Sequence, residues 1–179
     1  MGRHLHRHAG WDLGRPQPAL RALADTGALQ GRVLDVGCGT GEHVLMAAEL
    51  GLDATGVDFA PNALQVAERK ARERGLTARF LRRDARKLED LGELFDTVLD
   101  CGLFHIFDDD DRTAYVASVR SVLPPGGRFF LLCFSDRQPG DQGPRRITGN
   151  DIDSTERATL ASPTNPDGIH AWLVALTRT

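Results

Sequence analysis

The sequence has little cysteine, no excess of positive charge and no long apolar run, and each shortage excludes a class of protein. Its three cysteines, Cys38, Cys101 and Cys133, show no spacing typical of a disulfide framework. The net charge of −3 argues against a general nucleic-acid-binding protein. No apolar stretch is long enough to span a bilayer, and the first residues lack the apolar core of a signal peptide. We therefore expect a cytoplasmic protein with reduced thiols that contacts neither nucleic acid nor membrane.

The chain of 179 residues is long enough for one domain with a substantial core. We expect residues 1–15 to form a flexible N-terminal segment or cap, and residues 16–179 to form a single domain. The first segment contains three alternating histidines, His4, His6 and His8. No fourth ligand is visible nearby, so a loose terminus is a better interpretation than a metal site.

From residue 32 to residue 134, short apolar runs alternate with amphipathic runs of helical period. The expected strands are 32–36, 53–58, 78–84, 95–102 and 128–134, and the expected helices are 41–51, 60–75 and 109–127. An earlier helix starts near Pro16 and is expected to end at Gly31. This alternation predicts an α/β fold with a doubly wound, mostly parallel sheet.

The stretch "LDVGCGTG" from Leu34 to Gly41 follows a predicted strand and opens a predicted helix, as a nucleotide-binding loop does. Its glycines Gly37, Gly39 and Gly41 have the spacing G-x-G-x-G, whereas a dinucleotide fingerprint is G-x-G-x-x-G. Asp35 precedes the loop and would repel a pyrophosphate, but it suits a cationic ligand. The loop therefore argues against a nicotinamide-dependent oxidoreductase.

Two further carboxylates follow the next two predicted strands. Asp58 is placed to accept hydrogen bonds from both hydroxyls of a ribose. Asp84 is placed to accept from the exocyclic amine of adenine, while the amide of Ala85 donates to the ring. Helix capping and turn formation are the alternative roles of both aspartates. Three carboxylates at three strand ends suit an adenosine with a cationic amino-acid arm, which is S-adenosylmethionine.

From Val33 to Phe134 the sequence resembles the class I S-adenosylmethionine-dependent methyltransferase family. The segments that carry the resemblance are "VLDVGCGTG", "TGVDFAP", "RRDARKL", "FDTVLDCGLFHIF" and "LPPGGRFFLLCF". The resemblance implies the Rossmann-like fold of that family and S-adenosylmethionine as the cofactor. It also implies that Asp35 and the backbone of Gly37 and Gly39 hold the methionine arm of the cofactor.

The resemblance implies three further contacts to the cofactor. The carbonyl of Cys101 would accept from the amine of the methionine arm, and Phe59 would lie on the adenine. Simple packing is the alternative role of Phe59. The segment "GWDLGRPQPAL" resembles the N-terminal cap of a small-molecule branch of the family, in which Trp11 would close over the methionine end.

The C-terminal region is shorter than the family fold requires. That fold ends with a helix and an antiparallel hairpin, but residues 147–170 leave little room for a full helix. Only residues 170–176 are clearly typical of a strand, with room for one more near residues 157–161. We therefore expect part of the last parallel strand to be exposed. Either a second copy of the chain in a homodimer would cover it, or the substrate pocket would be unusually open.

His105 follows the fourth predicted strand and is the candidate general base of a methyl transfer. A histidine that only shapes the pocket wall is the alternative. The run Asp108–Asp111 suggests a metal site, but carboxylates are also favoured at a helix N-terminus. Arg145 and Arg146 would either clamp a substrate carboxylate or only hold a loop.

The sequence therefore predicts an S-adenosylmethionine-dependent methyltransferase that methylates an oxygen, nitrogen or sulfur atom of a small molecule, in a setting such as specialised metabolism. The alternative on the same fold is a protein that binds the cofactor without methylating, as a scaffold or a cyclase.

Overall fold

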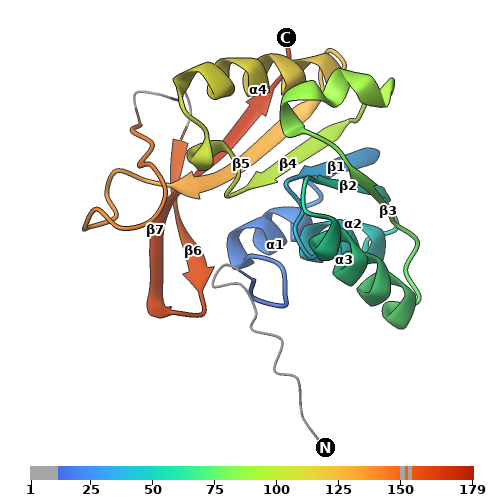
Figure 1. Ribbon diagram of the computed structural model, residues 1–179, viewed down its shortest axis with the longest axis horizontal. Helices are drawn as coiled ribbons and strands as arrows, with labels where there is room; N and C mark the ends of the chain where they lie inside the picture. The colour runs from blue at the N-terminus through green and yellow to red at the C-terminus, as the bar shows by residue number, and fades with distance from the viewer. Residues whose placement is uncertain (1–11, 150–151, 153–154) are drawn as a thin grey trace, which may run out of the picture.

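The structure is a computed structural model, and it describes residues 12–149, 152 and 155–179. It contains one sheet of seven strands in the order β3-β2-β1-β4-β5-β7-β6 (Figure 1). The strands are β1 (Arg32–Val36), β2 (Asp53–Asp58), β3 (Arg79–Arg82), β4 (Thr97–Cys101), β5 (Arg128–Phe134), β6 (Thr155–Ser162) and β7 (Asn165–Thr177).

The first five strands are parallel, and β7 is antiparallel to both of its neighbours, β5 and β6. The carboxyl ends of β1, β2 and β4 therefore meet at one edge of the sheet. In open α/β sheets this edge is where ligands bind. The predicted α/β fold with a doubly wound, mostly parallel sheet is confirmed.

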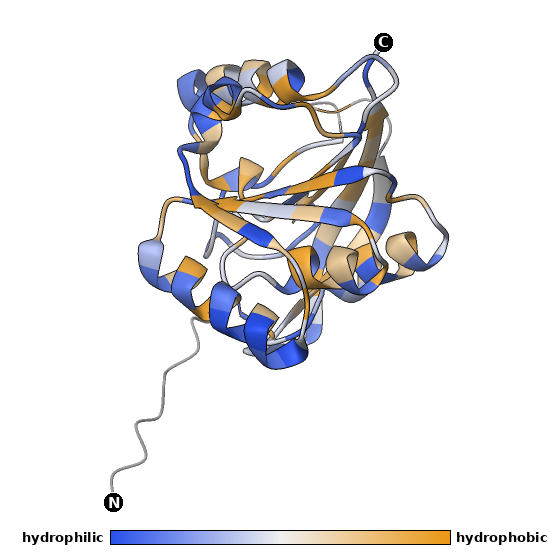
Figure 2. Cartoon of the chain, turned by 90° about the vertical axis from the view of Figure 1, so that its right-hand side faces the viewer, coloured by the Kyte–Doolittle hydropathy of each residue, from blue (hydrophilic) through white to orange (hydrophobic). Residues whose placement is uncertain are grey.

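Helices cover both faces of the sheet (Figure 1). On one side lie α1 (Pro18–Asp25), α2 (Glu42–Glu49) and α3 (Pro61–Arg74), and on the other lie the short 3-10 helices η1 (Ala85–Leu91) and η2 (Phe104–Ile106) and helix α4 (Asp109–Val122). Figure 2 shows hydrophobic residues along the strands and hydrophilic residues on the outer turns of the helices.

The core is divided by the sheet because successive side chains of a strand point to opposite faces. Val33 of β1 packs with Val44 of α2 and Leu64 of α3. The next residue, Leu34, belongs to the opposite cluster with Tyr115 of α4. The same alternation places Asp35 on the α2 side, where its Oδ2 lies 3.8 Å from Nδ1 of His43.

Several predicted elements agree with the structure to the residue, namely the strands at 32–36, 53–58 and 128–134. The first helix is shorter than predicted: it ends at Asp25, with Thr26 as its C-cap, and not at Gly31. The helix predicted for residues 109–127 also ends early, at Val122, ahead of the prolines at positions 124 and 125. Proline has no N–H to continue a helix and restricts the residue before it.

The C-terminal region forms a hairpin of β6 and β7, and β7 begins at Asn165, five residues earlier than predicted. Residues 135–149 and 152 contain no helix, which agrees with the predicted shortening. The expectation that β5 is exposed is wrong. Its edge is paired with β7, Leu131 and Cys133 pack against Ile147 and Val174, and Leu132 packs under Leu20 of α1. No helix of the described part is long and apolar enough to cross a membrane.

Candidate functional site

A cleft with a volume of about 1040 Å³ lies at the carboxyl edge of the sheet. This volume is at the upper end of the range of about 300–1,000 Å³ that is usual for small-molecule sites. Its lining comes from the glycine loop, the ends of β2 and β4, η2, residues 12–17 and the C-terminal hairpin. The sequence-predicted residues on its wall are Gly37, Gly39, Asp58, Phe59, Asp84, Ala85, Cys101 and His105.

The glycine loop is held against the end of β2 by its backbone. The N–H groups of Gly37 and Cys38 both donate to the carbonyl of Val57, at 2.8 and 2.9 Å. The N–H of Gly39 donates to Oδ2 of Asp58 at 2.8 Å. The loop therefore places its remaining backbone groups and the Asp58 carboxylate on the same side of the cleft.

Asp58 accepts a second backbone hydrogen bond, from the N–H of Ala60 to Oδ1 at 2.8 Å. The turn-forming role that was weighed for this residue is therefore present. Each carboxylate oxygen can accept two hydrogen bonds. One acceptor site on each oxygen remains, and the residue lines the cleft. The pair of remaining sites matches the two hydroxyls of a ribose.

Asp84 is the N-cap of η1 and accepts from the N–H of Arg86. The Arg86 guanidinium also holds this carboxylate at both oxygens, at 3.0 and 2.8 Å, and pairs with Asp111. Hydrogen bonds from Arg86 lower the pKa of Asp84. Three of about four acceptor sites are used in this way. One site on Oδ2 is left for a donor such as an exocyclic amine.

Asp35 is the most constrained carboxylate near the cleft, with 1% of its surface exposed. Its Oδ2 is buried and accepts no hydrogen bond from the described residues. Burial raises its pKa well above the usual range, and the charges of Asp100 and Asp58 add to the effect. A buried carboxylate oxygen without a partner is costly unless a cation or donor satisfies it. This oxygen fits the positively charged methionine arm of S-adenosylmethionine.

His43 lies next to Asp35 and was missed by the sequence analysis. Its Nδ1 is 3.8 Å from Asp35 Oδ2, and its Nε2 accepts from the backbone N–H of Gln17 at 3.1 Å. Burial lowers the pKa of His43 to about 4, so the ring is neutral and does not neutralise Asp35. The only signal in the sequence is its place in the first turn of the helix that follows the glycine loop.

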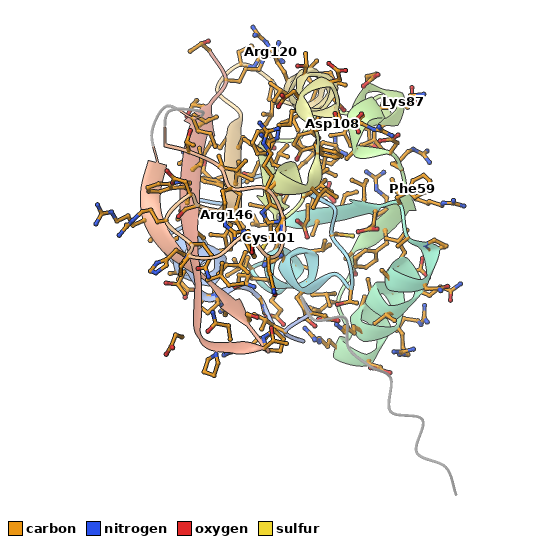
Figure 3. All side chains as sticks on the ribbon, turned by 60° about the vertical axis from the view of Figure 1, so that its left-hand side comes forward. Phe59, Lys87, Cys101, Asp108, Arg120 and Arg146 are labelled. Atoms are coloured by element: carbon orange, nitrogen blue, oxygen red, sulfur yellow. The ribbon has the colours of Figure 1, made fainter. Side chains whose placement is uncertain are left out.

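Phe59 and Cys101 lie at different points of the cleft wall (Figure 3). Phe59 is 67% exposed, so it does not serve core packing, and the Arg82 guanidinium lies 5.1 Å from its ring centroid. Cys101 ends β4, and burial raises the pKa of its thiol well above the usual range. Its side chain is therefore neutral. Trp11 lies outside the described residues.

His105 lies in η2 and is buried, with its ring on the cleft wall. Its Nδ1 accepts from the backbone N–H of Phe134 at 3.1 Å. Burial lowers its pKa to about 4, helped by the charges of Arg112 and Arg146. A neutral imidazole carries one hydrogen, so Nδ1 as an acceptor places that hydrogen on Nε2.

The acidic run and the two arginines have structural roles. Asp108 caps α4 through the N–H of Asp111, and Arg145 pairs with Asp109. Arg146 donates to four backbone carbonyls of the loop after β5, those of Gln138, Gly140, Gln142 and Pro144. Among the described residues no group of acidic, histidine or cysteine side chains could hold a metal ion.

Gln17 is a second residue that sequence reasoning missed. It is buried, and its side-chain amide pairs with the backbone of Ala161 in β6, with bonds of 3.0 and 2.8 Å. The backbone N–H of Gln17 also donates to His43 of α2. Gln17 therefore connects the segment before α1 with α2 and with β6, beside the cleft. A contact across 144 positions leaves no local pattern in a sequence.

Comparison with known proteins assigns the chain to a family. Residues 33–127, more than half of the chain, match the family described as "Methyltransferase domain". The 2-heptyl-1-hydroxyquinolin-4(1H)-one methyltransferase of Mycobacteroides abscessus is 36% identical over 77% of this chain and 62% of its own length. The "Probable thiol methyltransferase 2" of Arabidopsis thaliana is 32% identical over 69% of this chain and 56% of its own length. The chain thus spans about three fifths of these curated relatives.

A solved structure extends the similarity to nearly the whole chain. The structure described as "Conversion of a Disulfide Bond into a Thioacetal Group during Echinomycin Biosynthesis" has a TM-score of 0.86 and 36% sequence identity. The match covers 96% of this chain and 85% of that chain. The chain belongs to the class I S-adenosylmethionine-dependent methyltransferase family.

Proposed function

We propose that this protein transfers a methyl group from S-adenosylmethionine to an oxygen or sulfur atom of a small molecule. One observation carries the proposal: Asp35, two residues before Gly37, has a buried Oδ2 that accepts no hydrogen bond from the described residues. Asp35 does not itself line the cleft, but Gly37 and Gly39 of the adjoining loop do, together with several apolar side chains. The buried oxygen suits the cationic arm of the cofactor, and the apolar side chains suit an apolar acceptor molecule.

The similar proteins support the choice of acceptor atom. Their names refer to a hydroxyquinolone, to a thiol and to the conversion of a disulfide into a thioacetal. Oxygen and sulfur are therefore favoured over nitrogen, which the sequence left open. A role in specialised metabolism and a cytoplasmic location are parts of the same proposal that rest on the sequence alone. The homodimer suggested by the sequence has lost its stated reason, because β7 covers the edge of β5.

When bound, the cofactor supplies a methyl group on a positively charged sulfur. The residues of the chain have three tasks. Asp58 would hold the ribose, Asp84 and Phe59 the adenine, and Asp35 with the loop at Gly37 and Gly39 the methionine arm. The apolar wall would exclude water and align the acceptor, which is the main contribution that a protein makes to such a displacement. Its members are Leu13, Leu103, Ile106, Phe107, Phe134 and Leu160.

Isothermal titration of the purified chain with S-adenosylmethionine, S-adenosylhomocysteine and NADH tests the cofactor. We expect both adenosyl ligands to bind and NADH not to bind. A labelled-methyl incorporation assay with a cell extract as the source of acceptors then tests the reaction. Absence of adenosyl binding would reject the proposal. Tight binding with no methyl incorporation into any extract would favour a protein that binds the cofactor without methylating.

A further inference from the structure

We propose that His105 is a fixed hydrogen-bond donor to the acceptor rather than a general base, and that the methyl acceptor is a group that ionises without help from the protein, such as a thiol or an acidic hydroxyl. This inference rests on the proposed function and narrows its substrate class. It follows from the hydrogen bonds of His105 and from the state of the other titratable groups of the cleft.

The orientation of His105 is fixed by a backbone group. The N–H of Phe134 can only donate, so it requires a lone pair on Nδ1 of His105, 3.1 Å away. The ring also packs edge-on against the Phe134 ring, with centroids 4.9 Å apart. Rotation of the imidazole would leave the buried N–H of Phe134 unpaired. The hydrogen of the neutral ring therefore stays on Nε2.

His105 lines the cleft, and none of the hydrogen bonds found among the described residues uses its Nε2. An acceptor molecule that reached Nε2 would therefore meet an N–H and not a lone pair. To act as a base, the ring would have to gain a second hydrogen. Its surroundings oppose that charge: burial, Arg112 of α4 and Arg146 of the loop after β5 all lower the pKa of His105.

The acidic side chains and the other histidine of the cleft, each of which could act as a base, have a hydrogen-bond or ion-pair partner. The acceptor sites that remain on Asp58 and Asp84 are those proposed for the cofactor. The pairs are Asp12 with Thr40, Glu42 with Lys70 and Arg74, His43 with Gln17, Asp58 with Gly39 and Ala60, and Asp84 and Asp111 with Arg86. Burial keeps Cys101 in its neutral thiol form, which is no base. Within the described part of the chain, the lining thus carries side chains of both charges, and its acidic side chains either are held by partners or would hold the cofactor.

These conditions select an acceptor that is an anion when it reacts. A donor such as Nε2–H forms a stronger hydrogen bond with a thiolate or phenolate than with the neutral group. The proton leaves the acceptor to water before the methyl transfer, the acceptor lone pair forms the new bond to carbon, and the cofactor sulfur keeps the electron pair of the broken bond.

The test uses thiophenol and the more acidic 4-nitrothiophenol as acceptors, with labelled S-adenosylmethionine and the full chain. We expect the midpoint of the pH–rate profile to shift to lower pH for the more acidic thiol, by the difference between the two thiol pKa values. A common midpoint near pH 6–7, the usual range of histidine, would overturn the inference. So would failure to methylate either thiol by a chain that binds S-adenosylmethionine. Failure to bind the cofactor would instead reject the proposed function.

Two variants of His105 distinguish a role as hydrogen-bond donor to the acceptor from a purely structural role. In His105→Asn the amide oxygen can replace Nδ1 and accept from Phe134, but no donor reaches the cleft. In His105→Gln the amide nitrogen can replace Nε2, while the bond to Phe134 is lost. We expect the Asn variant to fold normally and lose thiol methylation roughly ten- to hundredfold, the effect of a hydrogen bond to a charged group. We expect the Gln variant to retain more activity than the Asn variant, and the reverse order would overturn the inference.

The tautomer itself can be observed without a substrate. Nitrogen NMR of the labelled chain, with the His105→Asn variant for assignment, distinguishes a protonated ring nitrogen from an unprotonated one. We expect His105 to carry its hydrogen on Nε2 and not to titrate between about pH 5 and about pH 8, the range in which an ordinary histidine changes charge. A hydrogen on Nδ1, or titration in this range, would contradict the proposal.

Discussion

The N–H of Gly39 donates to Oδ2 of Asp58 over 2.8 Å, so the loop after β1 holds the carboxylate that ends β2. The two residues lie 19 positions apart and on adjacent parallel strands. The bond fixes the carboxylate before any ligand binds. A group held in this way loses little conformational entropy when it receives a ribose.

Replacement of Asp58 by alanine is therefore expected to weaken S-adenosylhomocysteine binding roughly ten- to hundredfold, since two hydrogen bonds to a charged group are lost. Isothermal titration measures the change. Asp53→Ala is the matched control, because Asp53 begins the same strand at the opposite edge of the sheet and its side chain is 67% exposed. Equal losses in both variants would show that Asp58 does not contact the ligand.

Replacement of Asp35 by asparagine is expected to stabilise the ligand-free protein at high pH. Burial raises the pKa of this carboxyl in the folded state above its usual value of 3.8. The folded protein thus holds the proton more tightly than the unfolded chain, and stability falls as pH rises from about 4 through the raised pKa. Asparagine removes this loss. We expect a higher Tm than wild type at pH 8 and a difference that disappears towards pH 4.

The same variant is expected to bind S-adenosylmethionine more weakly, because the amide carries no charge to pair with the cation. Burial raises the pKa of the neighbouring Asp100 to about 6, and its charge acts on Asp35, so Asp100→Asn is measured beside the Asp35 variant. Thermal melts between about pH 4 and about pH 8, with and without S-adenosylmethionine, measure both the stability difference and the loss of cofactor binding. A difference in Tm that does not vary with pH would contradict the assigned protonation of Asp35.

Gln17→Leu is expected to destabilise the protein by about 1–3 kcal/mol, because buried polar groups lose their partners. The variant removes both bonds to the backbone of Ala161 while keeping the size of the side chain. Denaturant unfolding measures the loss, and hydrogen exchange at the Ala161 amide locates it. Gln65→Leu, on the exposed side of α3, is the control. Unchanged exchange at Ala161 would show that the contact does not hold β6.

Gly41→Ala is expected to be more destabilising than Gly75→Ala, although both residues have positive φ, of 86° and 64°. At Gly41 a Cβ would lie 2.7 Å from the Cβ of Ala67 and 2.9 Å from the Phe80 ring. At Gly75 it would meet no described atom within 4 Å. Backbone strain alone costs about 1–2 kcal/mol, and overpacking adds about 1–3 kcal/mol. Equal unfolding free energies for the two variants would refute this difference.

The parts of the fold that were predictable are those with a strong local signal. Strands β1 and β5 are rich in apolar residues, and β2 begins and ends with an aspartate, so their limits could be read directly. The centre of β6 and most of β7 were expected, near residues 157–161 and at residues 170–176. The first five residues of β7 were not, since they include Pro166 and Gly168, residue types that are rare in strands. Pairing with β5 and β6 overrides that local preference, and the sequence alone does not reveal such long-range pairing.

The residues of the candidate site also fall into those with a local signal in the sequence and those that only the tertiary structure brings together. Asp58 and the glycine loop follow from their positions at strand ends, and their proximity follows from the parallel topology. Asp84 was placed on the cleft correctly, but its ion pair with Arg86 depends on a side-chain conformation that spacing does not give. His43 and Gln17 have only a tertiary reason to be near Asp35. The cofactor contacts of these residues remain predictions for the binding experiments.

The stretch that matches the family, residues 33–127, contains the glycine loop, Asp58 and Asp84. Much of the proposed acceptor wall comes from outside it, namely from residues 12–17, Phe134 and Leu160. In the proposed function, the cofactor residues thus lie inside the matched stretch, whereas the acceptor residues lie both inside it, at Leu103, Ile106 and Phe107, and outside it. Exchange of the two outer stretches for those of a relative would change the range of acceptors while the cofactor loop stays intact, which makes this small domain suitable for grafting new specificities.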